Sequence, residues 1–240
     1  MAARFHLHGE LADLLTDAER RQPVMRPVDG TSTVKHVVES LGVPHTEYGE
    51  LRVNGAPVRD RYQLQDGDVV DVYPTEQVSM TTTEPRFILD THLGTLARYL
   101  RLLGFDVVYD NAADDDELIK RAQVEARTLL TRDRGLLRRR TTTNARFVRS
   151  ADPRKQLTDV VRRFGLADRI RPYTRCTACN GMLEPVSKAD VTRLVGPGTL
   201  RHYDAFTACA ACGKVYWKGS HHARISRLVA AGRAPSTTVE

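Results

Sequence analysis

The sequence is poor in cysteine and aromatic residues, and no long apolar run interrupts it. Only 4 of its 240 residues are cysteine, and they form two close pairs after residue 175. A secreted scaffold held by disulfides would carry more cysteines, spread along the chain. No apolar segment approaches the roughly 20 residues that span a bilayer, the N-terminus has no apolar signal-peptide core, and no solenoid-length repeat occurs. We therefore expect a cytoplasmic protein without membrane segments.

Charge is distributed unevenly along the chain. Residues 1–80 hold 8 Lys and Arg against 13 Asp and Glu, a net charge of −5. Residues 81–240 hold 28 against 17, a net charge of +11. The length fits one large domain or two to three small ones. An acidic front and a basic rear indicate separate units, of which the rear faces a polyanion.

Residues 1–76 show the pattern of an α+β domain. Apolar residues at helical spacing over 34–41 predict a helix, and the segments 4–8 and 69–73 predict strands. Asn54-Gly55 between short apolar runs predicts a hairpin, because a type I′ turn needs positive φ at both central positions. The stretches 53–58 and 64–70 resemble ubiquitin-like β-grasp modules related to small sulfur carriers. Without the terminal Gly-Gly of a carrier, the module is expected to bind a protein partner or act as a scaffold.

Residues 77–85 have the polar, β-branched composition of a linker ending in Pro85. Beyond it, residues 86–170 alternate between strand and helix patterns. Strands are predicted at 87–89, 105–109, 128–131 and 146–148, and helices at 93–103, from about 114, from about 134, and at 153–164. This alternation predicts an α/β domain whose parallel sheet has helices on both faces.

Acidic residues follow several of these strands. Asp90 and Asp133 come just after the first and third strands, and the cluster at 114–117 opens the helix after the second. Because ligands bind beyond the carboxyl ends of parallel strands, these acids are expected to converge there. Carboxylate oxygens suit Mg²⁺ or Mn²⁺, which can activate water for phosphodiester cleavage. The alternative is that each Asp is only a helix cap or a turn residue.

The middle unit also resembles a known nuclease family. The segments 87–90, 96–106, 116–118 and 130–134 are similar to the mut-seven C-terminal ribonuclease domain family, which has a PIN-like fold. Members pair this fold with a trailing zinc ribbon, and some carry a leading ubiquitin-like module. The resemblance implies that Asp90, Asp116 and Asp133 are the metal-binding catalytic acids.

Arginines surround the predicted acids. We place Arg98 and Arg101 on the polar side of the first helix of this unit, and Arg132 and Arg134 beside the third acid. Arginine binds phosphate through two parallel hydrogen bonds, so these four residues are predicted to contact an RNA backbone. The alternative interpretation of such a run is a solvated helix face.

The rear unit, residues 171–232, contains all four cysteines. Cys176-x-x-Cys179 and Cys209-x-x-Cys212, with 29 residues between the pairs, supply the four thiolates of a closed structural Zn²⁺ site. A redox Cys-x-x-Cys is the alternative. We expect a helix over 187–195 and a disordered tail over 233–240. The small core of this unit is expected to contain Tyr203, Phe206, Tyr216 and Trp217. A basic edge is expected from Lys214, Lys218, His221, His222, Arg224 and Arg227.

Together these patterns predict a PIN-like, metal-dependent ribonuclease between a β-grasp module and a zinc ribbon. Mg²⁺ or Mn²⁺ would serve catalysis, Zn²⁺ would serve structure, and RNA would be the substrate. The rival hypothesis is a non-catalytic RNA-binding or ribosome-associated zinc-ribbon protein. In that case the acids would be structural caps.

Overall fold

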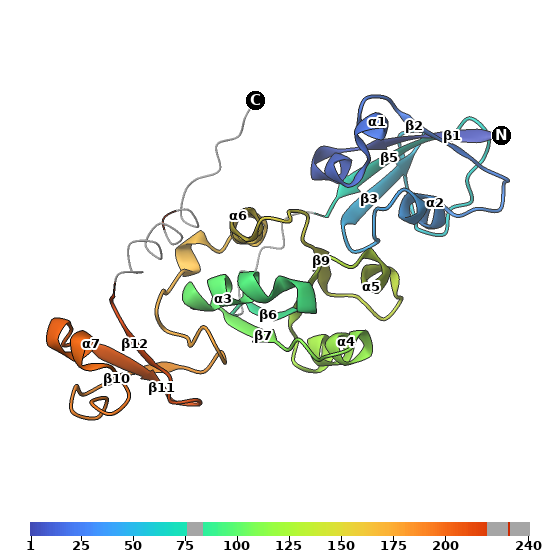
Figure 1. Cartoon of the computed structure of the whole chain (residues 1–240). Helices are drawn as coiled ribbons and strands as arrows, with labels where there is room; N and C mark the ends of the chain where they lie inside the picture. Colours follow the sequence, from blue (N-terminus) through green and yellow to red (C-terminus); the bar gives the residue numbers. More distant parts are fainter. Residues whose placement is uncertain (76–83, 220–229, 231–240) are drawn as a thin grey trace.

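The computed structural model describes residues 1–75, 84–219 and 230. Figure 1 shows three units in chain order: a mixed sheet with helices in blue, a parallel sheet in green, and a small antiparallel sheet in orange. In the described ranges, no helix has the length and apolar character needed to cross a membrane. Residues 77–83 of the predicted linker 77–85 lie outside the described residues. So do the tail over 233–240 and the predicted basic residues His221, His222, Arg224 and Arg227.

The first unit is the β-grasp domain that the sequence predicts. Its sheet has the order β2-β1-β5-β3-β4, with β1 and β5 parallel at its centre. The strands are β1 (Ala2–Leu7), β2 (Val24–Pro27), β3 (Tyr48–Val53), β4 (Ala56–Val58) and β5 (Val69–Pro74), and the helices are α1 (Asp17–Arg20) and α2 (Val34–Ser40). Asn54 and Gly55, at the β3–β4 hairpin, have φ of 52° and 82°, as predicted.

The second unit is a four-stranded sheet with the order β7-β6-β8-β9, in which every neighbouring pair is parallel. Its strands are β6 (Arg86–Leu89), β7 (Asp106–Tyr109), β8 (Thr128–Thr131) and β9 (Ala145–Phe147). Its helices are α3 (Gly94–Leu102), α4 (Asp115–Val124), α5 (Arg134–Arg138) and α6 (Pro153–Arg163). The chain steps from β6 to β7 on one side and then to β8 on the other. The switch point of strand order therefore lies between β6 and β8.

Helices cover both faces of this sheet. The apolar residues of α3 and α6 form one core with Phe87, Leu89, Val107 and Leu130. On the other face, α4 and α5 pack on Ile88, Leu129 and Ala145, and this second core continues without a break into the β-grasp core. Each of the two units has its own sheet, and their buried apolar residues are in contact with each other.

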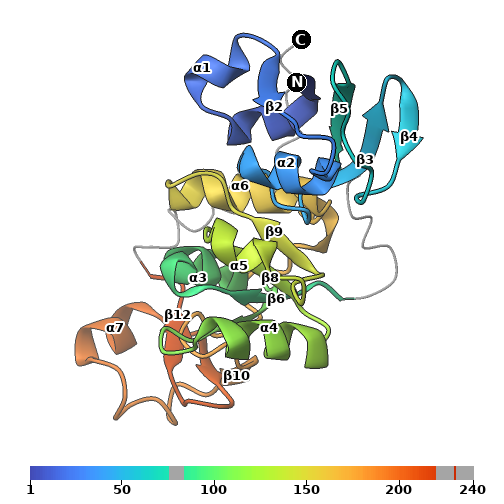
Figure 2. The same cartoon turned by 90° about the vertical axis from the view of Figure 1, so that its right-hand side faces the viewer.

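A buried carboxylate fixes this shared interface. The side chain of Glu47 is 0% exposed. Its oxygens accept hydrogen bonds from the backbone N–H of Phe147 at 2.7 Å, from Arg149 at 3.0 Å and from Arg163 at 2.9 Å. Arg138 of α5 donates to the carbonyl oxygen of Glu39 at 2.8 Å. Figure 2 shows the β-grasp domain lying along α6, α5 and β9. The β-grasp domain therefore packs against the sheet domain of the same chain.

The third unit is a small antiparallel sheet with the order β10-β11-β12, built from β10 (Leu183–Val186), β11 (Phe206–Cys209) and β12 (Val215–Trp217). The helix predicted over 187–195 is wrong: this segment forms turns, and the helix is α7 (Pro197–His202). Pro197 accounts for the start of α7, because proline is favoured in the first turn of a helix and disfavours helical backbone at the residue before it. Trp217, predicted to be in the core, is 41% exposed.

Candidate active site and cysteine cluster

Asp90 and Asp133 lie at the carboxyl ends of β6 and β8, on the two sides of the switch point. One threonine joins them. The hydroxyl of Thr131 donates to Oδ2 of Asp90 at 2.7 Å and accepts from the backbone N–H of Asp133 at 2.8 Å. The sequence placed these two acids at one edge of the sheet, and the structure links them there.

The carboxylate of Asp90 is buried, with 6% of the residue exposed. Besides Thr131, the hydroxyl of Thr91 donates to its Oδ1 at 2.9 Å. Within the part of the chain that the structure describes, no Lys, Arg or His nitrogen is recorded within 4.0 Å of it as an ion pair. A buried carboxylate with no cationic side chain paired to it suits a cation supplied from outside the chain.

Asp133 is exposed and caps α5, accepting from the backbone N–H of Gly135 at 2.6 Å. The cap interaction uses Oδ1. Asp133 is therefore a helix cap, which is the alternative role that the sequence left open for these acids. Its other oxygen, Oδ2, has no recorded hydrogen bond to the described residues.

Asp116 lies apart from this pair. Its side chain is 91% exposed and accepts from Arg139 at 2.6 Å, and Asp115 accepts from the same guanidinium at 2.9 Å. The cap of α4 is Asp114, which accepts from the backbone N–H of Glu117 at 2.8 Å. Among the described residues, no group of three or more carboxylates is gathered closely enough to hold a metal ion. The three predicted acids are thus not gathered into one ligand set.

The predicted phosphate-binding arginines have different surroundings. Arg98 is exposed on α3. The prediction that Arg101 lies on the polar side of this helix is wrong: it is 4% exposed and donates to the carbonyl oxygens of Val107 at 2.9 Å and Ala178 at 2.8 Å. The cysteine-containing unit docks on that part of α3, and the Arg101 guanidinium hydrogen-bonds across the junction.

Arg132 and Arg134 also make contacts within the chain. Arg132 donates to the carbonyl oxygens of Val148, Arg149 and Ser150, which follow β9. Arg134 donates to the carbonyl oxygen of Leu14 in the β-grasp domain at 3.3 Å, and its guanidinium lies 5.1 Å from the ring centroid of Phe147. Both residues therefore hold structural elements beside Asp133.

The four cysteines form a compact cluster. The ligand atoms of Cys176, Cys179, Cys209 and Cys212 all lie within 4.8 Å of one another, and all four cysteines are free of disulfides. A Cβ added to Gly181 would lie 2.7 Å from Sγ of Cys209, so glycine is needed beside the cluster. Four convergent thiols of this kind fit a tetrahedral Zn²⁺ with no open position, as the sequence predicts.

The crowded thiols do not share one acidity. Burial raises the pKa of Cys176, but hydrogen bonds from the Tyr216 hydroxyl and from backbone N–H groups outweigh this effect and lower the pKa to about 6. The Gly181 backbone N–H favours the Cys179 thiolate, yet burial and the neighbouring thiols raise the pKa of Cys179 to about 12. Four thiolates can coexist in this space when a divalent cation compensates their charge.

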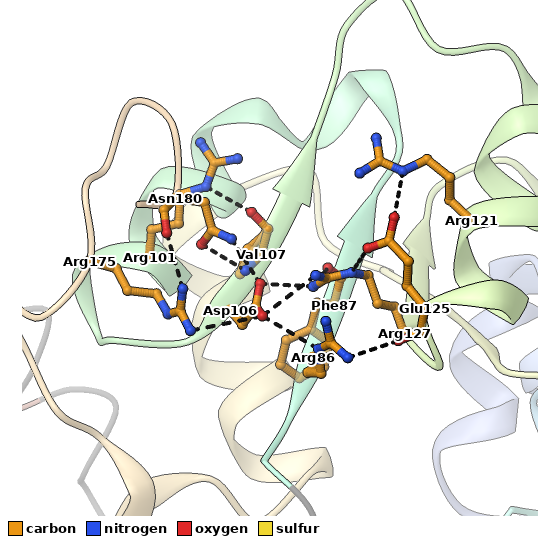
Figure 3. A network of polar contacts seen from close by, with 10 residues as sticks. All are labelled: Arg86, Phe87, Arg101, Asp106, Val107, Arg121, Glu125, Arg127, Arg175 and Asn180. Carbon is orange, nitrogen blue, oxygen red and sulfur yellow. Dashed lines mark hydrogen bonds and ion pairs between the residues drawn. The ribbon is translucent and has the colours of Figure 1, made fainter. Parts of the chain in front are cut away.

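A polar network joins the cysteine loop to the amino end of the parallel sheet (Figure 3). Asp106 at the start of β7 accepts from Arg127 at 2.8 Å and from the side chain of Asn180 at 2.8 Å. Asn180 in turn accepts from the backbone N–H of Val107 at 3.0 Å. The side chain of Asn180 thereby occupies part of the open edge of β7. The cysteine unit is docked at the end of the sheet opposite to Asp90.

Sequence reasoning missed the residues that organise these sites. Thr131 ends a predicted strand and carries no other signal in the sequence. The spacing Thr-x-Asp could have indicated the bond, because it places the Thr131 hydroxyl near the backbone N–H of Asp133. Glu47 carries no local signal, because its partners are about a hundred positions away in the chain. Asp106 lies within the segment that resembles the nuclease family, and only the structure shows that it serves the ribbon junction.

Comparison with known families assigns both the front and the rear of the chain. The Mut7-C ubiquitin family matches residues 1–80, and the Mut7-C RNAse domain family matches residues 85–229, which is more than half of the chain. No curated protein and no solved structure gives a match. The two family matches agree with the β-grasp fold, the parallel sheet and the cysteine cluster described above. The chain therefore belongs to the Mut7-C RNAse domain family and carries the Mut7-C ubiquitin domain in front of it.

Proposed function

We propose that this protein is a metal-dependent ribonuclease that hydrolyses RNA phosphodiester bonds at the carboxyl edge of the parallel sheet. The observation that supports it best is Asp90: a buried carboxylate with two hydroxyl donors and no recorded cationic partner among the described residues, at the switch point of the sheet. The family match supplies the nuclease class. The four free thiols suit the reducing cytoplasm, where we place the protein.

In this proposal Asp90 and Asp133 hold Mg²⁺ or Mn²⁺, with Asp116 as the third acid. A cation bound there supplies Lewis-acid stabilisation of the phosphate and a lowered pKa for water. Thr131 links β6 to the start of α5, because its hydroxyl bonds the Asp90 carboxylate and the backbone N–H of Asp133. Thr91 orients the other oxygen of Asp90. These two hydroxyls hold the carboxylate in one rotamer, so little reorganisation is needed on binding.

Asp116 takes part only when its ion pair with Arg139 opens. The pair is solvent-exposed, with Arg139 40% and Asp116 91% exposed, so its opening has a small free-energy cost. Arg139 is then free to contact an RNA phosphate at the same edge. Of the four arginines first expected to bind phosphate, Arg98 has the exposure this role requires, whereas Arg101 is buried.

The cysteine unit has a structural role in the proposal. Zn²⁺ on the four thiolates shapes the loop that carries Asn180 and the carbonyl groups of Thr177 and Ala178, and this loop holds Arg101 and β7. With its four cysteines as ligands, the zinc ion has no open coordination position and takes no part in hydrolysis.

The test is cleavage of a labelled single-stranded RNA by zinc-loaded protein with Mn²⁺, with Mg²⁺ and without added divalent cation. Asp90→Asn is the active-site variant, and Asp168→Asn, an exposed aspartate in the short 3-10 helix Ala167–Arg169 that follows α6, is the matched control. We expect metal-dependent cleavage that is lost in Asp90→Asn and kept in Asp168→Asn. Metal-independent RNA binding without any cleavage would instead support the rival binding protein.

A further inference from the structure

A cavity lies between the β-grasp domain and the sheet domain, and neither Asp90 nor Asp133 lines it. Its volume is about 630 Å³. This falls in the range of about 300–1,000 Å³ that is usual for small-molecule sites. The β-grasp domain contributes Glu10, Glu50 and Tyr73 to its wall, and the sheet domain contributes Arg146, Arg162 and Arg163. Figure 2 shows the two domains meeting along α6.

Two of the three arginines have carboxylate partners. Arg162 pairs with Glu10 at 3.3 Å and Asp159 at 3.0 Å. Arg163 pairs with Glu47 at 2.9 Å and with Glu10 at 3.5 Å. These ion pairs hold the wall of the cavity and leave its carboxylates largely compensated.

Arg146 is different. In the described ranges, no carboxylate is recorded within 4.0 Å of its guanidinium, and its recorded hydrogen bond is to the carbonyl oxygen of Ala145 at 2.7 Å. Burial lowers the pKa of Arg146 below its ordinary value. Glu47 and Glu10 attract this guanidinium from beyond ion-pair distance, and Arg163 repels it. A partly buried guanidinium without a direct ion pair is therefore suited to an anion from outside the chain.

We propose that this cavity binds a mononucleotide, with the phosphate on Arg146. A phosphate accepts two parallel hydrogen bonds from one guanidinium, which suits the free side of Arg146. The cavity is much larger than a bare phosphate requires. Glu50 and Thr75, which also line it, offer oxygen atoms to the sugar hydroxyls. Because both domains build the wall, the bound ligand stabilises their docked arrangement.

Calorimetric titration of the full-length, zinc-loaded protein with uridine 5′-monophosphate tests this site, without added Mg²⁺ or Mn²⁺. The titration does not depend on the proposed ribonuclease activity, and Asp90→Asn is expected to bind equally. We expect one site per chain, binding weakened by about tenfold to a hundredfold in Arg146→Gln, and no change in Arg154→Gln. Arg154 is an exposed arginine at the start of α6 and serves as the control.

Uridine and inorganic phosphate identify the chemistry that is recognised. We expect no binding of uridine and weaker binding of inorganic phosphate than of the nucleotide. Equal nucleotide binding by the native protein and Arg146→Gln would overturn the proposal, as would uridine or inorganic phosphate binding as tightly as the nucleotide. If Arg146→Gln fails to fold, Arg146→Lys, which keeps the charge but loses the bidentate geometry, is expected to give the weakened binding.

Discussion

Replacement of Glu47 by Gln removes the buried charge at the centre of the interface between the β-grasp and sheet domains. The carboxylate is fully buried and bonds two guanidinium groups and one backbone N–H, at 2.7–3.0 Å. In Glu47→Gln, Arg149 and Arg163 lose this carboxylate and keep Glu10 as their carboxylate partner. Breaking a buried pair in this way costs about 3–5 kcal/mol of unfolding free energy. At about 2–4 °C per kcal/mol for a chain of this size, the melting temperature should fall by roughly 6–20 °C.

The control for this experiment is Glu50→Gln. Glu50 pairs with Arg52 at 2.8 Å, but both side chains are exposed, at 46% and 44%. An exposed pair contributes about 0–1 kcal/mol, so the control should melt within about 4 °C of the native protein. Circular dichroism during a thermal ramp measures both variants. Equal melting temperatures for Glu47→Gln and Glu50→Gln would show that the two domains are not held together as described.

Other predictions concern the ribbon, its junction and the hairpin. Cys176→Ser should lower bound zinc from about one ion per chain to near zero, measured by elemental analysis, whereas Ser187→Ala should keep it. Burial raises the pKa of Asp106, but hydrogen bonds from Arg127 and Asn180 outweigh it and hold the pKa below its ordinary value. The ionised Asp106 therefore stabilises the fold above its ordinary pKa, and this stabilisation is lost as pH falls through the folded-state pKa. Thermal melts below about pH 4 should show a smaller loss of stability in Asp106→Asn than in the native protein. Gly55→Ala should cost about 1–2 kcal/mol in urea unfolding, because φ is 82° there, and an unchanged midpoint would contradict the assigned turn.

Much of the fold follows from local patterns. The helical spacing of Val34, Val37 and Val38 predicts α2, and Asn54-Gly55 predicts the hairpin, since both signals act between residues close in sequence. The four strands of the sheet domain are short apolar runs separated by helical patterns, which is why their parallel order could be expected. The cysteine spacing predicts the cluster for the same reason: each pair is a local turn.

The missed features depend on long-range contacts. Arg98 and Arg101 share one face of α3 by spacing, yet the loop carrying Ala178 covers only Arg101. The burial of Glu47 follows from the docking of a whole domain, which no periodicity encodes. The acids at 114–116 form one run in the sequence, and only the structure assigns the cap to Asp114 and the ion pairs with Arg139 to Asp115 and Asp116.

Binding of Mn²⁺ to the zinc-loaded protein is the most direct test of the claim that the carboxyl edge of the sheet holds a divalent cation. Electron paramagnetic resonance measures the free Mn²⁺ during a titration of the native protein, Asp90→Asn and the exposed control Asp168→Asn. The account predicts one Mn²⁺ site in the native and control proteins, weakened at least about tenfold in Asp90→Asn. The same affinity in all three proteins, or no Mn²⁺ bound by the native protein, would contradict it.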